Sequence, residues 1–175
     1  MGQIKKTEPV KLIAGFIFSD EAYFEKTKSL LEKTFGKIDF ASDTLNFSHT
    51  DYYQKEFGHN LKRKFVSFQK LIPPKKLAAI KNITNKLENK LSSGVRRNIN
   101  IDPGYLDMAK LVLASTKDFN HRIYLDKGIF AEITLFYQDK GFKPREWTYP
   151  DYRTPEYNAI FCRIREIYIN QTRKE

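Results

Sequence analysis

The sequence predicts an α+β fold in which a ferredoxin-like βαββαβ N-terminal part is followed by an antiparallel β-meander and a C-terminal helix. The first observation behind this prediction is the order in which strand-like and helix-like segments alternate up to residue 101. The second is a pair of Asp-Lys-Gly strings, at 126–128 and 139–141, whose composition is typical of hairpin loops. The third is a length of 175 residues without a long linker, which predicts one domain over 1–175.

The first elements follow from apolar patterning and helix-end signals. Residues 10–18 are apolar on both alternating faces, which predicts a central strand buried on both sides. We expect Ser19 to cap a helix and Gly36 to end it in the left-handed conformation. Residues 37–47 and 62–72 predict two further strands, which a polar loop separates.

An amphipathic helix and a short strand complete the βαββαβ part. Aliphatic residues at helical spacing predict the helix: Leu77, Ile80, Ile83, Leu87 and Leu91. Residues 97–101 predict a strand. Asp102-Pro103-Gly104 predicts a turn, because proline fixes φ and glycine supplies conformational freedom. Residues 105–115 predict a further helix.

The two Asp-Lys-Gly strings set the register of the meander. Three-residue loops whose glycine has a positive φ would give three cross-strand pairs: Tyr124 with Phe130, Arg122 with Glu132, and Phe136 with Pro144. This register places Ile133 on the core face of the sheet and Glu132 on the opposite face. The final helix is expected to start at Thr154-Pro155 and to dock on the sheet through an apolar stripe.

The composition excludes several classes of protein. An apolar fraction of 41% and an aromatic fraction of 14% are too high for a disordered chain. The single cysteine, Cys162, excludes a disulfide scaffold and a multi-thiolate zinc site, and it is typical of a reducing cytoplasm. The longest apolar run, residues 12–18, is far shorter than the roughly 20 residues that cross a bilayer, so no membrane partner is expected. The spacing of Asp102, Lys117, Asp118 and His121 fits no metal-binding signature, and no metal is expected, although His49 and Asp51 have side chains that could ligate one.

Positive charge is concentrated in the middle of the chain. The net charge is +10, and residues 51–100 contain 12 basic and three acidic residues. Such a segment is typical of a surface that contacts phosphates. We therefore take Arg63, Arg96 and Arg97 as candidate ligand-binding residues, and RNA or a nucleotide as the candidate partner. The alternative is a solvated, lysine-rich surface without a ligand.

Five residues have the chemistry of general acids or bases, and we take them as candidate catalytic residues. His49 and Asp51 lie in the polar loop, Asp102 follows a predicted strand, and His121 and Glu132 belong to the meander region. Four of the five also have a purely structural interpretation. His49 and Asp51 would make local hydrogen bonds, Asp102 would belong to a turn, and Glu132 would form a cross-strand ion pair that fixes register.

Five more residues are candidates for ligand binding. Lys117 and Arg122 supply cations that would hold an anion close to the candidate catalytic residues. Tyr124 lies on the same predicted face of the meander as Arg122. Tyr149 and Asp151 belong to a segment, rich in tyrosine and proline, that either lines a pocket or anchors the loop before the last helix.

The chain contains five unusual strings: HTDYY (49–53), NINIDPGYL (98–106), KLVLASTKD (110–118), HRIYL (121–125) and WTYPDYR (147–153). In this order they resemble the prokaryotic domain-of-unknown-function family numbered 4416. The resemblance spans nearly the whole chain and implies no established activity, although some members are labelled GTP-binding proteins. No two of the eight glycines are closer than ten residues apart, so neither a P-loop nor a dinucleotide-binding glycine motif is present.

Two functions are therefore expected. The first is a module that binds a phosphate-bearing ligand, either RNA or a nucleotide. The alternative is a small hydrolase or transferase that acts on a phosphorylated substrate through a cluster of His, Asp, Glu and Arg side chains. A structural role in a protein complex would instead require an exposed apolar patch remote from the charge.

Overall fold

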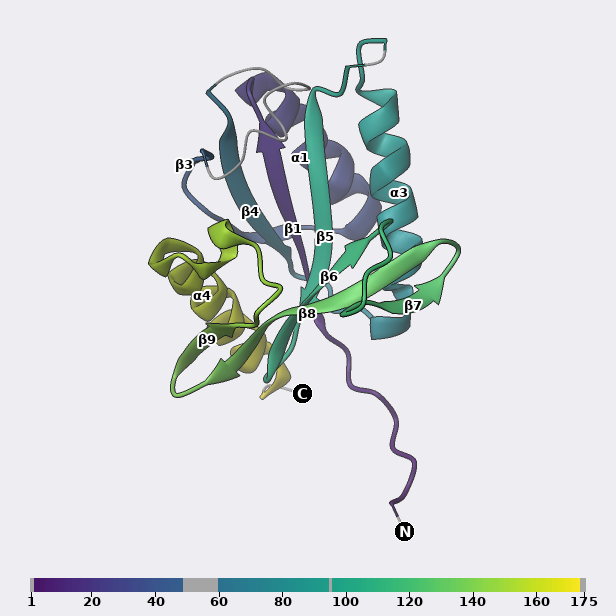
Figure 1. Cartoon of the computed structure of the whole chain (residues 1–175), viewed down its shortest axis with the longest axis vertical. Helices are drawn as coiled ribbons and strands as arrows, with labels where there is room; N and C mark the ends of the chain where they lie inside the picture. Colours follow the sequence, from purple (N-terminus) through teal and green to yellow (C-terminus); the bar gives the residue numbers. More distant parts are fainter. Residues whose placement is uncertain (1, 49–59, 95, 174–175) are drawn as a thin grey trace.

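A computed structural model describes residues 2–48, 60–94 and 96–173 (Figure 1). In the described chain the elements occur in this order: β1 (Lys11–Phe18), α1 (Glu21–Phe35), β2 (Ile38–Ala41), β3 (Leu45–Asn46), β4 (Lys62–Phe68), α3 (Leu77–Lys90), β5 (Ile99–Leu106), β6 (Lys110–Ser115), β7 (Ile123–Asp126), β8 (Ile129–Gln138), β9 (Gly141–Pro144) and α4 (Pro155–Thr172). Short 3₁₀ segments precede α3 (Pro74–Lys76) and α4 (Pro150–Arg153). The α+β class, the N-terminal β-α-β pattern and the C-terminal helix are confirmed, although three strands instead of two lie between α1 and α3.

All the strands belong to one antiparallel sheet with the order β2-β4-β1-β5-β6-β8-β7. The short strand β3 pairs with β4, and β9 pairs with β8. Because β6 pairs along the middle of β8, strands β7 and β9 lie on its other edge, at opposite ends. Within the described ranges, no helix is long and apolar enough to cross a membrane.

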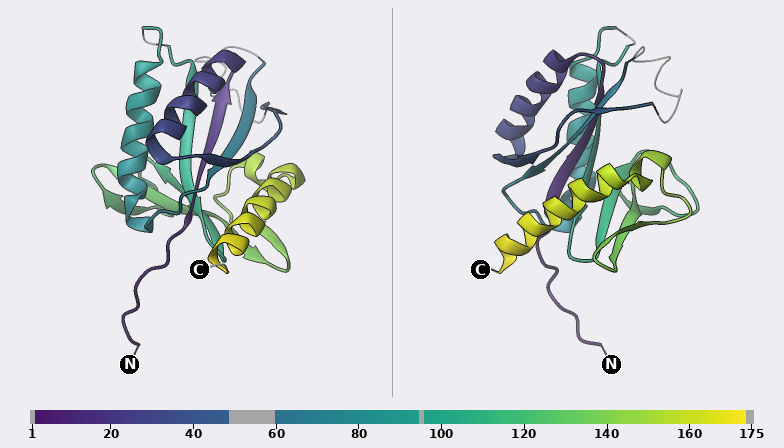
Figure 2. Two further views of the ribbon diagram at one scale, coloured as in Figure 1. Left: turned by 180° about the vertical axis from the view of Figure 1, so that it is seen from behind. Right: turned by 90° about the vertical axis from the view of Figure 1, so that its left-hand side faces the viewer.

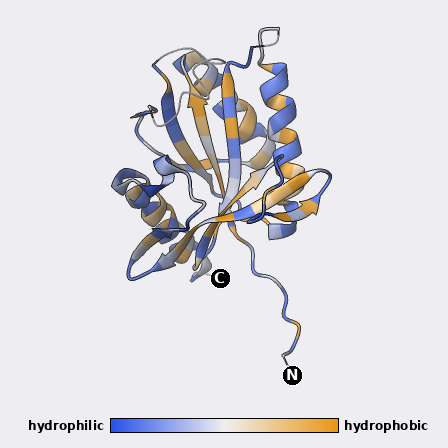
Figure 3. Cartoon of the chain, viewed as in Figure 1, coloured by the Kyte–Doolittle hydropathy of each residue, from blue (hydrophilic) through white to orange (hydrophobic). Residues whose placement is uncertain are grey.

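Strand β1 is the centre of the fold, and all eight of its residues are buried. Alternate side chains of a strand point to opposite faces, so β1 contributes to two cores. Leu12, Phe16 and their neighbours at even positions pack beneath α1 and α3, whereas Ile13 packs against α4. Figure 2 shows α1 and α3 side by side on one face of the sheet, and Figure 3 shows the hydrophobic residues concentrated along β1. Burying each large side chain contributes about 1.5–3 kcal/mol.

The ends of the helices are fixed largely by the residues that their sequence signals indicated. Gly36 ends α1 with a φ of 98°, and its N–H donates to the carbonyl of Glu32, as predicted. The N-terminal cap of α1 is Asp20 instead of Ser19, because the Asp20 carboxylate accepts the N–H of Ala22 at 2.9 Å. The hydroxyl of Thr154 accepts the N–H of Tyr157, which confirms the start of α4.

Several predicted boundaries are wrong. The segment 37–47 contains two short strands, β2 and β3, and the strand predicted over 62–72 ends at Phe68. The helix predicted over 105–115 is absent, because these residues form the end of β5 and the whole of β6. Asp107 makes the tight connection between them, since its Oδ1 accepts the N–H groups of Ala109 and Lys110 at 2.8 and 2.9 Å.

Asp102-Pro103-Gly104 lies inside β5 and forms no turn. Pro103 has no N–H to donate to a neighbouring strand. Gly104 lies where β6 begins to pair with β5, and a Cβ at this position would be 2.4 Å from the carbonyl oxygen of Val112. The ladder with β1 therefore continues through all three residues, and Gly104 permits the close approach at which the ladder with β6 begins.

Both hairpin loops of the meander have two residues instead of three, because Asp126 pairs with Ile129 and Gln138 with Gly141. Their central residues have positive φ, as the tight turns require: Lys127 (51°), Gly128 (76°), Asp139 (51°) and Lys140 (63°). The pairing of Tyr124 with Phe130 is confirmed. The predicted partner of Phe136 is wrong by one residue, since Lys143 lies opposite it.

The predicted faces of β8 are wrong in part, since Ile129 and Leu135 are buried as predicted but Ile133 is not. Glu132 is 3% exposed and Ile133 is 40% exposed, the reverse of the prediction. The cause is a bulge at Thr134: Leu111 pairs with Leu135 while the next residue of β6 pairs with Ile133. The extra residue reverses the alternation of side chains along β8. It turns the carboxylate of Glu132 into the molecule.

Candidate ligand-binding cavity

A cavity of about 610 Å³ lies where β5 and β6 diverge, between α3 and the segment that precedes α4. The pairing of β5 with β6 covers only Gly104 to Leu106, so residues 99–103 are not paired with β6. Side chains from α3 form hydrogen bonds with backbone groups of β5 that do not pair with β6. Lys81 Nζ donates to the Ile101 carbonyl at 2.9 Å, and Glu88 Oε1 accepts the Ile101 N–H at 2.6 Å.

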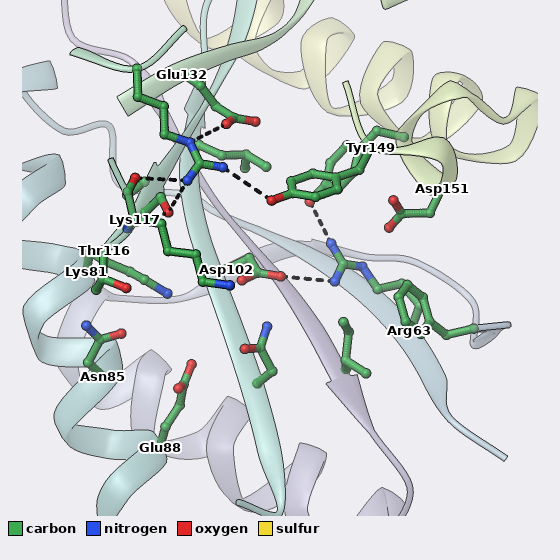
Figure 4. A pocket seen from close by; sticks show the side chains of 18 of the residues that line it. Arg63, Lys81, Asn85, Glu88, Asp102, Thr116, Lys117, Glu132, Tyr149 and Asp151 are labelled. Atoms are coloured by element: carbon green, nitrogen blue, oxygen red, sulfur yellow. Dashed lines mark hydrogen bonds and ion pairs between the residues drawn. The ribbon is translucent and has the colours of Figure 1, made fainter. Parts of the chain in front are cut away.

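Arg63 forms one wall of the cavity (Figure 4). Its side chain comes from β4 and crosses β1 above Gly15, where a Cβ would be 2.9 Å from Nη2. Nη1 donates to Asp102 Oδ2 on β5 at 3.1 Å, and Nη2 donates to the Tyr152 hydroxyl at 2.6 Å. Arg63 is 1% exposed and its guanidinium lies over the Phe65 ring. Through these contacts it links β4, β5 and the segment before α4 inside the protein.

The carboxylate of Asp102 is held in its ionised form. Desolvation by burial on its own would raise the pKa of this carboxyl, but the charges of Arg63 and Lys81 outweigh it and lower the pKa below the ordinary value. The Asp102 side chain is 26% exposed and lines the cavity, so it presents a negative charge there.

This lowered pKa predicts how stability depends on pH. A carboxyl whose pKa is lower in the folded state stabilises the protein above the unfolded pKa of about 3.9, and that contribution disappears as the pH falls through the folded pKa. The free energies of unfolding of the natural chain and of Asp102→Asn should therefore converge as the pH falls from about 5 through the folded pKa of Asp102. Urea denaturation at several pH values measures this difference. A difference that is constant with pH would contradict the assignment.

Glu88 and Arg97 line a second, more polar part of the cavity. Burial raises the pKa of Glu88, although the charge of Lys81 and the N–H of Ile101 act in the opposite direction. Arg97 Nη1 donates to Glu88 Oε2 and to Asn100 Oδ1, both at 3.2 Å. The amide of Asn100 is thereby oriented beside Asp102.

Arg122 organises the opposite end of the cavity. Its Nε donates to Glu132 at 2.7 Å, and its Nη1 donates to Ser115 Oγ and to the Lys117 carbonyl, both at 2.9 Å. Its Nη2 donates to the Tyr149 hydroxyl at 3.2 Å. The contact between Arg122 and Glu132 is the cross-strand pair that the sequence predicted. Figure 4 shows Glu132, Tyr149 and Lys117 around this end of the cavity.

The structure brings eight of the thirteen candidate site residues to the wall of this cavity: Arg63, Arg97, Asp102, Lys117, Arg122, Glu132, Tyr149 and Asp151. His121 does not line it. Its ring lies nearly parallel to those of Phe119 and Trp147, and Nε2 is 3.3 Å from Glu132 Oε2. Arg96 and Tyr124 are exposed outside the cavity. His49 and Asp51 lie outside the described residues.

The sequence analysis missed part of the site. Lys81, Asn85 and Glu88 lie on one face of α3, and their spacing of four and three residues was the signal that could have identified them. Asn100, Ser115 and Tyr152 also line the cavity. These three residues reach the cavity only because β5 and β6 diverge, and no local sequence pattern predicts that divergence.

The basic residues of the middle segment do not form one surface. Arg63, Lys81 and Arg97 reach the cavity, whereas Lys62 and Lys64 lie within 3.7 and 2.5 Å of Glu21. Other lysines of this segment are exposed away from the cavity lining: Lys70, Lys75, Lys76, Lys86 and Lys90. Among the residues that the structure describes, no three His, Cys, Asp or Glu side chains gather as metal ligands.

The comparisons with known proteins concern almost the whole chain. Residues 8–168 match the model of the family described as "Domain of unknown function (DUF4416)". No curated protein matches the chain. No solved structure matches it.

Proposed function

The chain belongs to the DUF4416 family, and since that description assigns no activity, we propose from the chemistry of the cavity that the protein binds a small phosphorylated ligand such as a nucleotide. The observation that carries the proposal is the set of bonds that Arg122 makes. Ser115 Oγ accepts hydrogen bonds from Arg122 Nη1 and from the Lys117 N–H, and the Tyr149 hydroxyl accepts one from Arg122 Nη2.

An oxygen that accepts these bonds keeps its own hydrogen for another acceptor. The hydroxyls of Ser115 and Tyr149 are thus oriented as donors, beside the cation of Lys117 and the hydroxyl of Thr116. Several oriented donors around a cation suit the oxygens of a phosphate, which accept multiple charge-assisted hydrogen bonds. We place the phosphate at this end of the cavity.

The size and charge of the cavity support a small ligand. Its volume of about 610 Å³ lies within the range of roughly 300–1,000 Å³ that is usual for small-molecule sites. Five cationic side chains and four carboxylates line it: Arg63, Lys81, Arg97, Lys117 and Arg122, with Glu88, Asp102, Glu132 and Asp151. RNA is the less favoured partner, because the exposed lysines of the basic segment lie away from this cavity.

Binding is favoured over hydrolase or transferase chemistry by the environment of the candidate catalytic carboxylates. Asp102 accepts from Arg63, and Glu132 accepts from Arg122. The cation of Arg63 stabilises the ionised form of Asp102 and lowers its pKa, so this carboxylate is a weak base. We also propose a cytoplasmic location, because a single cysteine, Cys162, is typical of a reducing compartment. We further propose a ferredoxin-like relationship for the part of the sheet with the strand order β2-β4-β1-β5.

The test is a calorimetric titration of the protein with inorganic phosphate and with AMP at low ionic strength. We expect both to bind, and we expect Lys117→Ala to weaken the binding about tenfold through loss of one charge-assisted contact. Lys70→Ala is the matched control, because it removes the same charge from an exposed position outside the cavity. Equal effects of the two substitutions would show that only the net charge matters, and absence of binding would refute the proposal.

A further inference from the structure

Two buried hydrogen-bond donors in the cavity lack partners. Within the described part of the chain, Arg63 Nε and Asn100 Nδ2 are buried and donate to no acceptor with normal hydrogen-bond geometry. Both residues line the cavity, and Asn100 is 5% exposed. A buried donor without an acceptor costs about 1–3 kcal/mol, so native proteins usually satisfy such groups with solvent or a ligand.

Asn100 cannot turn freely to find an acceptor. Its Oδ1 accepts from Arg97 Nη1 at 3.2 Å, which fixes the amide and leaves Nδ2 as its donor. The Asn100 amide is close enough to Asp102 to act as a weak donor that lowers the pKa of this carboxyl, yet Nδ2 has no partner of normal hydrogen-bond geometry. The side of the cavity between α3 and β5 therefore carries an oriented amide donor beside an oriented carboxylate acceptor.

The carboxylate of Asp102 has acceptor capacity to spare. Oδ2 accepts from Arg63 Nη1 at 3.1 Å, and a carboxylate has about four lone-pair positions. Because the side chain remains 26% exposed at the cavity, a ligand reaches the remaining positions. The site thus requires a ligand group that donates one hydrogen bond and accepts another within a few ångströms.

We infer that Asn100 and Asp102 recognise a sugar hydroxyl of the phosphorylated ligand, so that the ligand is a sugar phosphate, either free or within a ribonucleotide. A hydroxyl donates through its hydrogen to Asp102 and accepts from Asn100 Nδ2 through a lone pair. A fully ionised phosphate cannot do both, since its oxygens only accept. This inference rests on the proposed function, because it assumes that the phosphate lies at the Ser115 and Lys117 end of the same cavity.

The test compares four ligands by calorimetric titration of the full chain: inorganic phosphate, ribose 5-phosphate, AMP and 2′,3′-dideoxy-AMP. We expect ribose 5-phosphate to bind at least tenfold more tightly than phosphate, and dideoxy-AMP at least tenfold more weakly than AMP. A site built to bond a hydroxyl discriminates strongly against an analogue that lacks it, because its buried polar groups are then left unpaired. If ribose 5-phosphate shows the gain and AMP does not bind, the ligand is a free sugar phosphate.

The variant Asn100→Leu should bring the affinities of AMP and dideoxy-AMP to within about twofold of each other. Asn89→Leu, at an exposed position of α3 outside the cavity lining, is the matched control and should keep the full discrimination. Binding of phosphate without any gain from the sugar hydroxyls in the natural chain overturns this inference alone. Failure of all four ligands to bind overturns the proposed function with it.

Discussion

Arg122→Lys should weaken the binding of phosphate and of AMP by about 100-fold, which corresponds to about 2.7 kcal/mol. The guanidinium donates to four groups at once: Glu132, Ser115 Oγ, the Lys117 carbonyl and the Tyr149 hydroxyl. A lysine ammonium has three donors on a flexible stem and does not reproduce this planar arrangement. The hydroxyls of Ser115 and Tyr149 would then lose the orientation that makes them donors to an anion.

The natural control for this substitution is Arg163→Lys on α4, where Arg163 forms an exposed ion pair with Glu166 at 2.8 Å. This change should leave the affinity unaltered, since exposed pairs contribute little.

Tyr149→Phe tests the proposed phosphate position without disturbing Glu132. We expect it to weaken the binding of phosphate and of AMP about tenfold, because one hydroxyl donor is removed. Calorimetry gives the dissociation constants, and circular dichroism shows whether each variant is folded. Unchanged affinity in folded Arg122→Lys and Tyr149→Phe would be incompatible with the proposed phosphate position.

Arg63→Met should lower the free energy of unfolding by about 3–5 kcal/mol, the usual cost of removing one partner of a buried ion pair. Arg63 contacts Asp102, the Tyr152 hydroxyl and the Phe65 ring, and these come from different elements. Its removal leaves the Asp102 carboxylate without its main counter-charge and the Tyr152 hydroxyl without its donor. Denaturant titration monitored by fluorescence measures the change.

A double substitution distinguishes the ion pair from simple loss of packing. Asp102→Asn in the Arg63→Met background removes the stranded charge, so we expect it to recover part of the lost stability. Lys86→Met changes an exposed residue of α3 and should alter stability by less than about 0.5 kcal/mol. If Arg63→Met costs no more than Lys86→Met, Arg63 does not hold β4, β5 and the segment before α4 together.

The elements that local patterns determine were predictable from the sequence. The apolar run of β1, the glycine that ends α1, the aliphatic spacing of α3 and the Thr154-Pro155 start of α4 all report interactions within a few residues. The errors arose where a long-range contact overrides a local preference. Asp102-Pro103-Gly104 has the composition of a turn, but pairing with β1 keeps it extended.

Some of the residues that line the cavity were predictable from their side-chain chemistry. Charged residues such as Arg63, Asp102 and Arg122 were identified from their chemistry, and the cavity contains them. The inward direction of Glu132 depends on the bulge at Thr134, which only the pairing of β8 with β6 determines. The basic residues of the segment 51–100 are close together in the sequence but do not form one surface. Strand and helix periodicity distribute neighbouring residues over different faces.

The most direct test of the central claim, that this cavity binds a phosphorylated ligand at its Arg122 end, is a titration of ¹⁵N-labelled protein with AMP followed by NMR. We expect the largest shifts of backbone amide signals at Ser115 to Lys117 and at Tyr149, with smaller ones at Asn100 and Asp102. Shifts confined to the exposed lysines at Lys70, Lys75 and Lys76, or no shifts with either AMP or ribose 5-phosphate at millimolar concentration, would contradict it.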